Sequence, residues 1–164
     1  MGHYYNHYNN KYNPNGQIPK DNIQAPPTSL TPQDKKDTVP VFWQDNPCYC
    51  KAKDFAVRCG QLCIRLTQKN NMVITGYATQ LSRSSSSVLL NLSEGITPYI
   101  SNKEKILRFT ISMREAQESI SNLLLISEIV PTILSPNERD ALIKLAEEII
   151  AILNKSIYTI KRKM

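Results

Sequence analysis

Apolar residues recur at helical spacing in four stretches of the chain, and no stretch shows the alternation of a β-strand. The first stretch covers about residues 50–68, and one of its faces carries Phe55, Cys59, Leu62, Cys63 and Leu66. The other stretches cover about 73–94, 101–130 and 135–161. Because short polar connections favour antiparallel neighbours, the pattern predicts an all-α fold, an antiparallel up-down-up-down four-helix bundle.

Residues that favour helix ends mark three of these boundaries. Ser101, with Glu104 three residues later, is typical of a capping box. Ser135 precedes Pro136, an order that combines an N-cap serine with a proline at the first helical position. Gly95 closes the second stretch and is predicted to be the left-handed C′ residue that ends this helix.

The first 47 residues differ in composition from the rest. They hold seven of the ten prolines, and the first sixteen residues contain five Asn and four Tyr. Such a segment has too few aliphatic residues to offset the entropy of ordering it. We therefore expect a disordered or extended N-terminal tail over 1–47 and one helical domain over 48–164. The four Lys of the tail balance its four Asp, so the net charge of +6 lies entirely on the helical domain.

The fourth predicted helix is apolar over a wide sector. Its two adjacent stripes carry Leu142, Leu145, Ile149, Ile152 and Leu153, and Ile143, Ala146, Ile150 and Ile157. A helix on the surface of a monomeric bundle needs an apolar stripe of about 100°, and this sector is wider. Either the helix is packed deeply at the centre of the bundle, or the additional stripe forms an interface between subunits.

Polar residues follow one side of the second predicted helix, and together with Gly95 we name them the polar stripe: Arg83, Ser87, Asn91 and Glu94. One interpretation is a hydrogen-bonded network that fixes the register of the second and third helices, with Arg114, Glu115 or Glu118 as partners. The alternative is a groove that faces a ligand. If the partner of Arg83 is buried, Arg83→Ala is expected to cost about 2–4 kcal/mol. The serines at 84–87 are small enough for helices to approach closely.

Basic residues gather at two helix ends that meet in an antiparallel bundle, the start of the third helix and the end of the fourth. They form the candidate nucleic-acid-binding site: Lys103, Lys105, Arg108, Lys161, Arg162 and Lys163. Such a patch could bind phosphates, and the alternative is an ordinary solvated surface. The Tyr and Asn residues of the tail could add stacking contacts with single-stranded RNA.

Residues that common catalytic and metal sites require are scarce. The only histidines are His3 and His7, both in the tail, so neither histidine-based catalysis nor a carboxylate di-metal bundle is expected. We therefore predict that the protein is not an enzyme and carries no cofactor and no metal. The cysteines have a C-x-C…C-x3-C spacing that matches no common zinc motif, so a structural zinc site and reduced thiols of core and linker are alternatives for Cys48, Cys50, Cys59 and Cys63.

Nothing in the sequence indicates a membrane protein or a secreted one. No apolar run approaches the ~20 residues that cross a bilayer, and the first residues lack the pattern of a secretory signal. We expect a cytoplasmic protein whose thiols stay reduced and which has no membrane partner.

Residues 80–95, QLSRSSSSVLLNLSEG, resemble the signature of a bacterial four-helix-bundle family named for proteins encoded in intervening sequences of large-subunit ribosomal RNA genes. That signature reads approximately QLRRAAxSIxxNIAEG, and the coinciding positions are Gln80, Leu81, Arg83, Ser87, Asn91, Glu94 and Gly95. Ser82, Ser84 and Ser85 replace a basic and two alanine positions. The Arg108-Phe109 pair and residues 114–119 also look like the family's third helix, so the resemblance covers roughly residues 50–163.

This resemblance implies a small bundle that tends to form homopentamers. The family includes the accessory proteins of diversity-generating retroelements, which associate with a reverse transcriptase and bind nucleic acid through a basic surface. Together with the basic helix ends, this favours a non-enzymatic, oligomeric protein that binds RNA or DNA, with a retroelement reverse transcriptase as a candidate partner. The alternative is a protein–protein interaction scaffold that does not bind nucleic acid.

Overall fold

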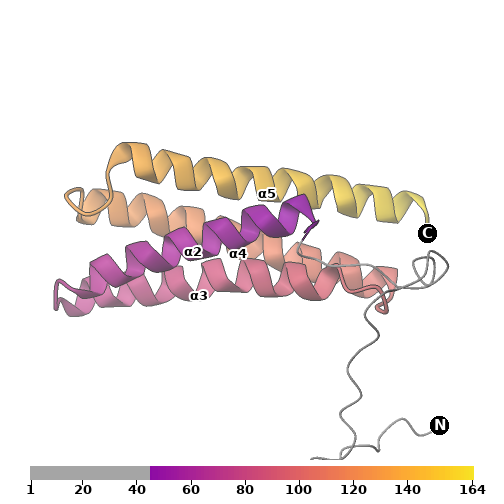
Figure 1. Cartoon of the computed structure of the whole chain (residues 1–164), viewed down its shortest axis with the longest axis horizontal. Helices are drawn as coiled ribbons and strands as arrows, with labels where there is room; N and C mark the ends of the chain where they lie inside the picture. Colours follow the sequence, from indigo (N-terminus) through magenta and orange to yellow (C-terminus); the bar gives the residue numbers. More distant parts are fainter. Residues whose placement is uncertain (1–44) are drawn as a thin grey trace, which may run out of the picture. The chain divides into compact units, whose positions relative to one another are not determined.

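The computed structural model describes residues 45–164, and over these residues the chain forms helices and no strand. Four helices follow one another: α2 (Pro47–Thr67), α3 (Met72–Gly95), α4 (Asn102–Ile129) and α5 (Pro136–Arg162) (Figure 1). The predicted all-α, four-helix class is therefore confirmed. In this part of the chain, no helix is both long enough and apolar enough to span a membrane.

The predicted tail over 1–47 falls mostly outside the described residues, which begin at Asp45. The tyrosines and asparagines considered for RNA stacking, and both histidines, fall outside them too. The last two residues assigned to the tail belong to the bundle instead, because Asn46 caps α2 and Pro47 is its first residue. The first helix thus begins about three residues earlier than the apolar pattern predicts.

Each helix begins at a short polar residue that accepts a backbone N–H. The Ser101 hydroxyl accepts from the Glu104 amide at 3.2 Å, and the Ser135 hydroxyl accepts from the Glu138 amide at 3.3 Å, so both predicted starts are confirmed. Asn46 caps α2 and Asn71 caps α3 in the same way. These side chains satisfy N–H groups that a helix leaves without an internal partner.

Gly95 does not end α3 in the way that the sequence predicts. It is the last residue within the helix, and the cap residue after it, Ile96, has a right-handed φ of −87° and ψ of −5°. The φ of Gly95 lies outside the left-handed region, so the predicted C′ role is wrong. The glycine meets a packing requirement, because a Cβ at this position would lie 2.4 Å from the ring of Phe109 in α4.

One apolar core fills the space between the four helices. All five apolar residues predicted to share a face of the first helix are buried. Large, fully buried side chains come from every helix, and they include Phe55, Leu62, Leu81, Leu92, Leu123, Leu142 and Ile149. Burial of each such side chain contributes roughly 1.5–3 kcal/mol, so the core is the main source of stability.

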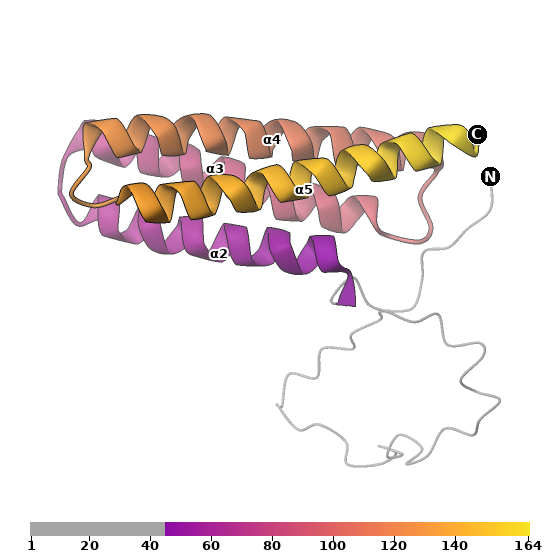
Figure 2. The ribbon, with the colours of Figure 1, turned by 90° about the horizontal axis from the view of Figure 1, so that it is seen from above.

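Side-chain contacts between helices join residues in antiparallel order. Cys63 near the end of α2 bonds to Ala78 near the start of α3. Glu94 near the end of α3 pairs with Arg108 near the start of α4. Figures 1 and 2 both show the start of α4 and the end of α5 at one end of the bundle.

α5 buries the middle of its wide apolar sector and leaves both flanks partly exposed. The fully buried residues are Leu142, Ala146, Ile149 and Leu153. The half-buried residues on the two flanks are Ile143, Leu145, Ile150, Ile152 and Ile157. The central stripe is thus fully packed inside the bundle, while the flank residues pack against the core and stay partly exposed.

Candidate nucleic-acid interface

The polar stripe of α3 lies along the contact with α4. At one end of the stripe, the Arg83 guanidinium donates a hydrogen bond to Glu118 Oε1 at 2.9 Å. In the middle, the Asn91 amide donates to the carbonyl and the hydroxyl of Ser87, at 2.9 and 3.0 Å. These bonds join α3 to α4 at Arg83, through Glu118 as one of the predicted partners, and stay within α3 at Ser87 and Asn91.

The ion pair of Arg83 and Glu118 is open to water. The two side chains are 65% and 38% exposed. Exposed pairs contribute about 0–1 kcal/mol. The condition for a cost of about 2–4 kcal/mol on Arg83→Ala is therefore not met, and we expect a cost below about 1 kcal/mol.

The other end of the stripe interlocks α3 with α4. Glu94 pairs with Arg108 at 2.6 Å, and Gly95 leaves the space that Phe109 fills. The Arg108 Nε is buried and has no hydrogen-bond partner among the described residues. Two adjacent residues of α3 thus contact two adjacent residues of α4. Glu94 forms an ion pair with Arg108, and the missing side chain of Gly95 makes room for the ring of Phe109. This double contact fixes the register of the two helices.

Arg108 therefore differs from the other residues of the candidate nucleic-acid-binding site. Its guanidinium is held by Glu94, and its side chain is only 35% exposed. A phosphate would have to compete with a carboxylate that is already in place. We assign Arg108 to the contact between α3 and α4, and not to the free cations of the surface.

The remaining five predicted cations gather at one end of the bundle, and we name them the basic end: Lys103, Lys105, Lys161, Arg162 and Lys163. Four of them are exposed and Lys105 is half-buried. Within residues 45–164, none of the five forms an ion pair. Figures 1 and 2 place the start of α4, which carries the first two, beside the end of α5, which carries the rest. Glu104 is a carboxylate on the same turn as the first two lysines.

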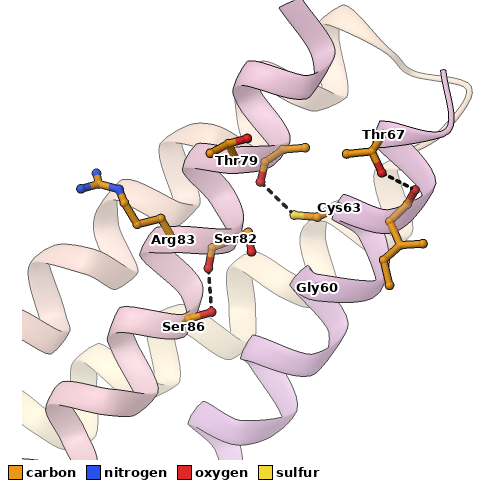
Figure 3. A pocket seen from close by; sticks show the side chains of 9 residues that line it. Gly60, Cys63, Thr67, Thr79, Ser82, Arg83 and Ser86 are labelled. Carbon is orange, nitrogen blue, oxygen red and sulfur yellow. Dashed lines mark hydrogen bonds between the residues drawn. The ribbon is translucent and has the colours of Figure 1, made fainter. Parts of the chain in front are cut away.

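A concave surface lies between α2 and α3, and we name it the α2–α3 groove. Its volume is about 750 Å³. Its lining residues are Gly60, Cys63, Ile64 and Thr67 of α2, and Ala78, Thr79, Ser82, Arg83 and Ser86 of α3. Figure 3 shows the Cys63 thiol turned toward the Ala78 carbonyl, which lies 3.2 Å away, and the Ser86 hydroxyl bonded to the Ser82 carbonyl. In the same view Arg83 points away from α2. Cys63, Thr67, Thr79 and Ser86 thus bond to backbone carbonyls, and the lining holds no pair of a nucleophile and a base.

The serine run serves packing at its first two positions. Ser84 and Ser85 are almost completely buried, while Ser86 is exposed. The hydroxyl of Ser119 in α4 bonds to that of Ser84 at 2.8 Å. The prediction that these serines let helices approach closely is confirmed for Ser84 and Ser85.

Three of the four cysteines are core residues. Burial raises the pKa of Cys48 to about 11, that of Cys59 to about 12 and that of Cys63 to about 11. Cys50 is exposed. Among the described residues, no three or more His, Cys, Asp or Glu side chains lie close enough together to hold a metal ion, so the four cysteines do not converge on one point.

Comparison with known proteins gives a family and a fold. Residues 44–155 match the family model described as 23S rRNA-intervening sequence protein. A crystal structure from Bacteroides thetaiotaomicron VPI-5482, described as a protein with unknown function from the S23 ribosomal protein family, is similar with a TM-score of 0.60. The two chains are 23% identical, and the match covers 67% of this chain and 97% of that one, so it shows the fold alone. No curated protein is significantly similar to the chain.

Proposed function

Because the chain belongs to the 23S rRNA-intervening sequence protein family, we propose that it is a non-enzymatic four-helix bundle that associates with nucleic acid. The observation that carries the proposal is the basic end, where five cations lie together and form no ion pair with any carboxylate of residues 45–164. Phosphate contacts by Lys and Arg supply most of the affinity of non-specific nucleic-acid binding. RNA and DNA are both candidate ligands, because such contacts read the backbone and not the bases.

The other charges of the bundle support the basic end as the place where phosphate binds. Along the contact of α2 with α5, Lys51 pairs with Glu148 and Arg65 with Glu138. These cations are neutralised where they lie. The basic end holds five of the ten cations of residues 45–164 that form no ion pair, and their charge would raise the local concentration of a polyanion.

We propose further that the protein is a homo-oligomer, as the resemblance of its signature to pentameric relatives implies. The half-buried flank of α5 that carries Ile143, Ile150 and Ile157 is the surface that oligomerisation would cover. Five copies would bring together five basic ends and multiply the attraction for phosphate. A retroelement reverse transcriptase is the candidate protein partner, on the strength of the same resemblance.

We also propose that the protein does not act as an enzyme. Among the described residues, the buried thiols have raised pKa values, and no serine lies beside a histidine that could activate it.

The test measures binding of labelled single-stranded RNA, duplex RNA and duplex DNA from about 50 to about 200 mM salt. We expect affinity to fall steeply with salt. The double variant Lys161→Gln/Lys163→Gln should flatten the slope of log K against log salt by about 0.7–0.9 for each phosphate that the protein no longer neutralises.

The matched control is Lys69→Gln/Lys144→Gln, which removes the same charge from exposed lysines in the α2–α3 turn and the first third of α5. If both double variants weaken binding equally, binding does not depend on the basic end. If no nucleic acid binds at the lowest salt concentration, the proposal fails. In that case a protein partner captured after nuclease treatment would favour the interaction scaffold.

A further inference from the structure

A groove lies between the start of α2 and the last turns of α5. Its volume is about 640 Å³, and its lining residues are Asn46, Pro47, Cys48, Ile152, Lys155, Ser156, Thr159 and Ile160. Figures 1 and 2 show that α5 continues beyond the point where α2 begins. The last turns of α5 therefore lack the neighbour that α2 provides along the rest of the helix, and we name this hollow the α2–α5 groove.

Polar groups in the α2–α5 groove already have partners. The Asn46 side-chain oxygen accepts the amides of Cys48 and Tyr49 at 2.9 and 3.2 Å. The Ser156 hydroxyl donates to the Ile152 carbonyl at 2.8 Å, and the Thr159 hydroxyl donates to the Lys155 carbonyl at 2.9 Å. What these residues offer an occupant is chiefly apolar surface, together with the exposed Lys155. Such a lining favours aromatic side chains over a polar ligand.

The chain itself carries apolar and aromatic residues directly before the groove. Val41, Phe42 and Trp43 precede the described residues, and they follow a segment that is poor in large apolar side chains. Trp43 is only three residues from Asn46, which lines the groove. Because an extended residue spans about 3.3–3.6 Å, a chain of this length reaches about 10 Å from Asn46, which is enough to enter the groove.

We propose that Phe42 and Trp43 occupy the α2–α5 groove and complete the cover over the end of α5. The apolar surface that the groove would offer the two rings comes from Pro47, Ile152 and Ile160. The Lys155 ammonium is placed at the rim, where a cation over an indole face adds a favourable interaction. Closing such a short connection costs little chain entropy, so the tethered segment has an advantage over any occupant from another molecule.

Tryptophan fluorescence tests the proposal directly, because Trp43 is the only tryptophan in the chain. In the full-length native protein we expect blue-shifted emission and resistance to acrylamide quenching. Both should disappear when urea unfolds the protein. Native emission as red and as easily quenched as that of the unfolded chain would overturn the proposal.

Thr159→Glu is the variant that places a charge in the groove without removing a core side chain. Its matched control is Thr79→Glu in the α2–α3 groove, because both threonines are exposed and both hydroxyls bond to the carbonyl four residues earlier at 2.9 Å. We expect Thr159→Glu to raise the quenching constant toward that of the unfolded chain, and Thr79→Glu to leave it unchanged. Circular dichroism verifies that both variants remain folded.

Dilution distinguishes the two possible sources of Trp43 protection, the tethered segment of the same chain and a contact with a second copy. Protection that is independent of protein concentration supports the tethered segment. Protection that disappears on dilution would assign Trp43 to a contact with a second copy and overturn the proposal, as would equal effects of the two Glu variants. Trp43→Ala should also lower the Tm of the bundle, and an unchanged Tm would contradict a role in covering α5.

Discussion

A single glycine shows how the contact between α3 and α4 depends on shape. A Cβ on Gly95 would lie 2.4 and 2.6 Å from two ring atoms of Phe109 and 3.3 Å from Cβ of Arg108. The ring belongs to a buried side chain and cannot retreat without disturbing the core. The close approach of the two helices therefore requires glycine at this position.

Gly95→Ala should destabilise the protein by about 1–3 kcal/mol, the usual cost of an added methyl group in a packed interior. The control is Gly76→Ala in the same helix, where no atom lies within 4 Å of the added Cβ. That change should leave stability unchanged or raise it by up to about 1 kcal/mol, since alanine favours helix over glycine. Urea unfolding followed by circular dichroism measures both. Equal effects would show that helix propensity, not the contact with Phe109, decides the result.

Residue roles at this contact could be predicted only in part from the sequence. The spacing of Arg83, Ser87, Asn91 and Glu94 indicates that they share one side of a helix, and a periodic pattern is enough for that. It does not tell which residue of α4 each one meets. Arg108 carries the positive charge of a phosphate ligand. Only the 2.6 Å distance between its guanidinium and the Glu94 carboxylate shows that it already forms an ion pair.

At the scale of the helices, two ion pairs mark the contact between α2 and α5. Lys51 bonds to Glu148 at 2.6 Å, and Arg65 pairs with Glu138 fourteen residues further along α2. The hydrogen bond from Lys51, and then its charge, lower the pKa of Glu148, and the same contact raises the pKa of Lys51. The pair therefore favours the folded state only while both groups are ionised.

The pH dependence of this contribution has a definite sign. Because the pKa of Glu148 is lower in the folded state than its ordinary 4.5, the stabilisation is present above that value and is lost as the pH falls through the folded pKa. At high pH it is lost again as Lys51 releases its proton above 10.5. Glu148→Gln should lower the Tm slightly near neutral pH, and its difference from the unmodified protein should close at both extremes. Glu147→Gln is the control, since Glu147 forms no ion pair within residues 45–164; a matching effect there would assign the change to net charge.

Helix positions could be predicted from the sequence more fully than helix surroundings. The spacing of apolar residues and the N-cap residues Ser101 and Ser135 are local signals. Each acts within a few residues of the helix boundary that it marks. The width of the apolar sector on α5 was also evident. Whether its flanks face a helix, a groove or another subunit depends on residues distant in sequence, and α2 proves too short to cover the end of α5 (Figure 2).

At the scale of the whole molecule, the bundle separates its charge from its thiols. The cations of the basic end lie at one end of the helices, while three thiols are distributed along the α2 side of the core, where burial keeps them protonated. At about pH 8, a thiol with a pKa of about 11 is ionised in roughly one molecule in a thousand. Its reaction with a disulfide reagent is therefore slow as long as the thiol stays buried in the folded bundle.

Thiol labelling reports how deeply each cysteine is buried. With Ellman's reagent and mass spectrometry of the products, we expect Cys50 to react quickly and Cys48 and Cys63, which line the two grooves, to react slowly. The fully buried Cys59 should react at a rate that follows unfolding in increasing urea. Cys50→Ser should remove the fast phase and leave the slow phase unchanged, because its side chain is exposed and outside the core. Fast reaction at a second cysteine would contradict the burial of the three thiols. Acceleration of the slow phase by a metal chelator would instead reveal a bound zinc ion that holds the thiols together.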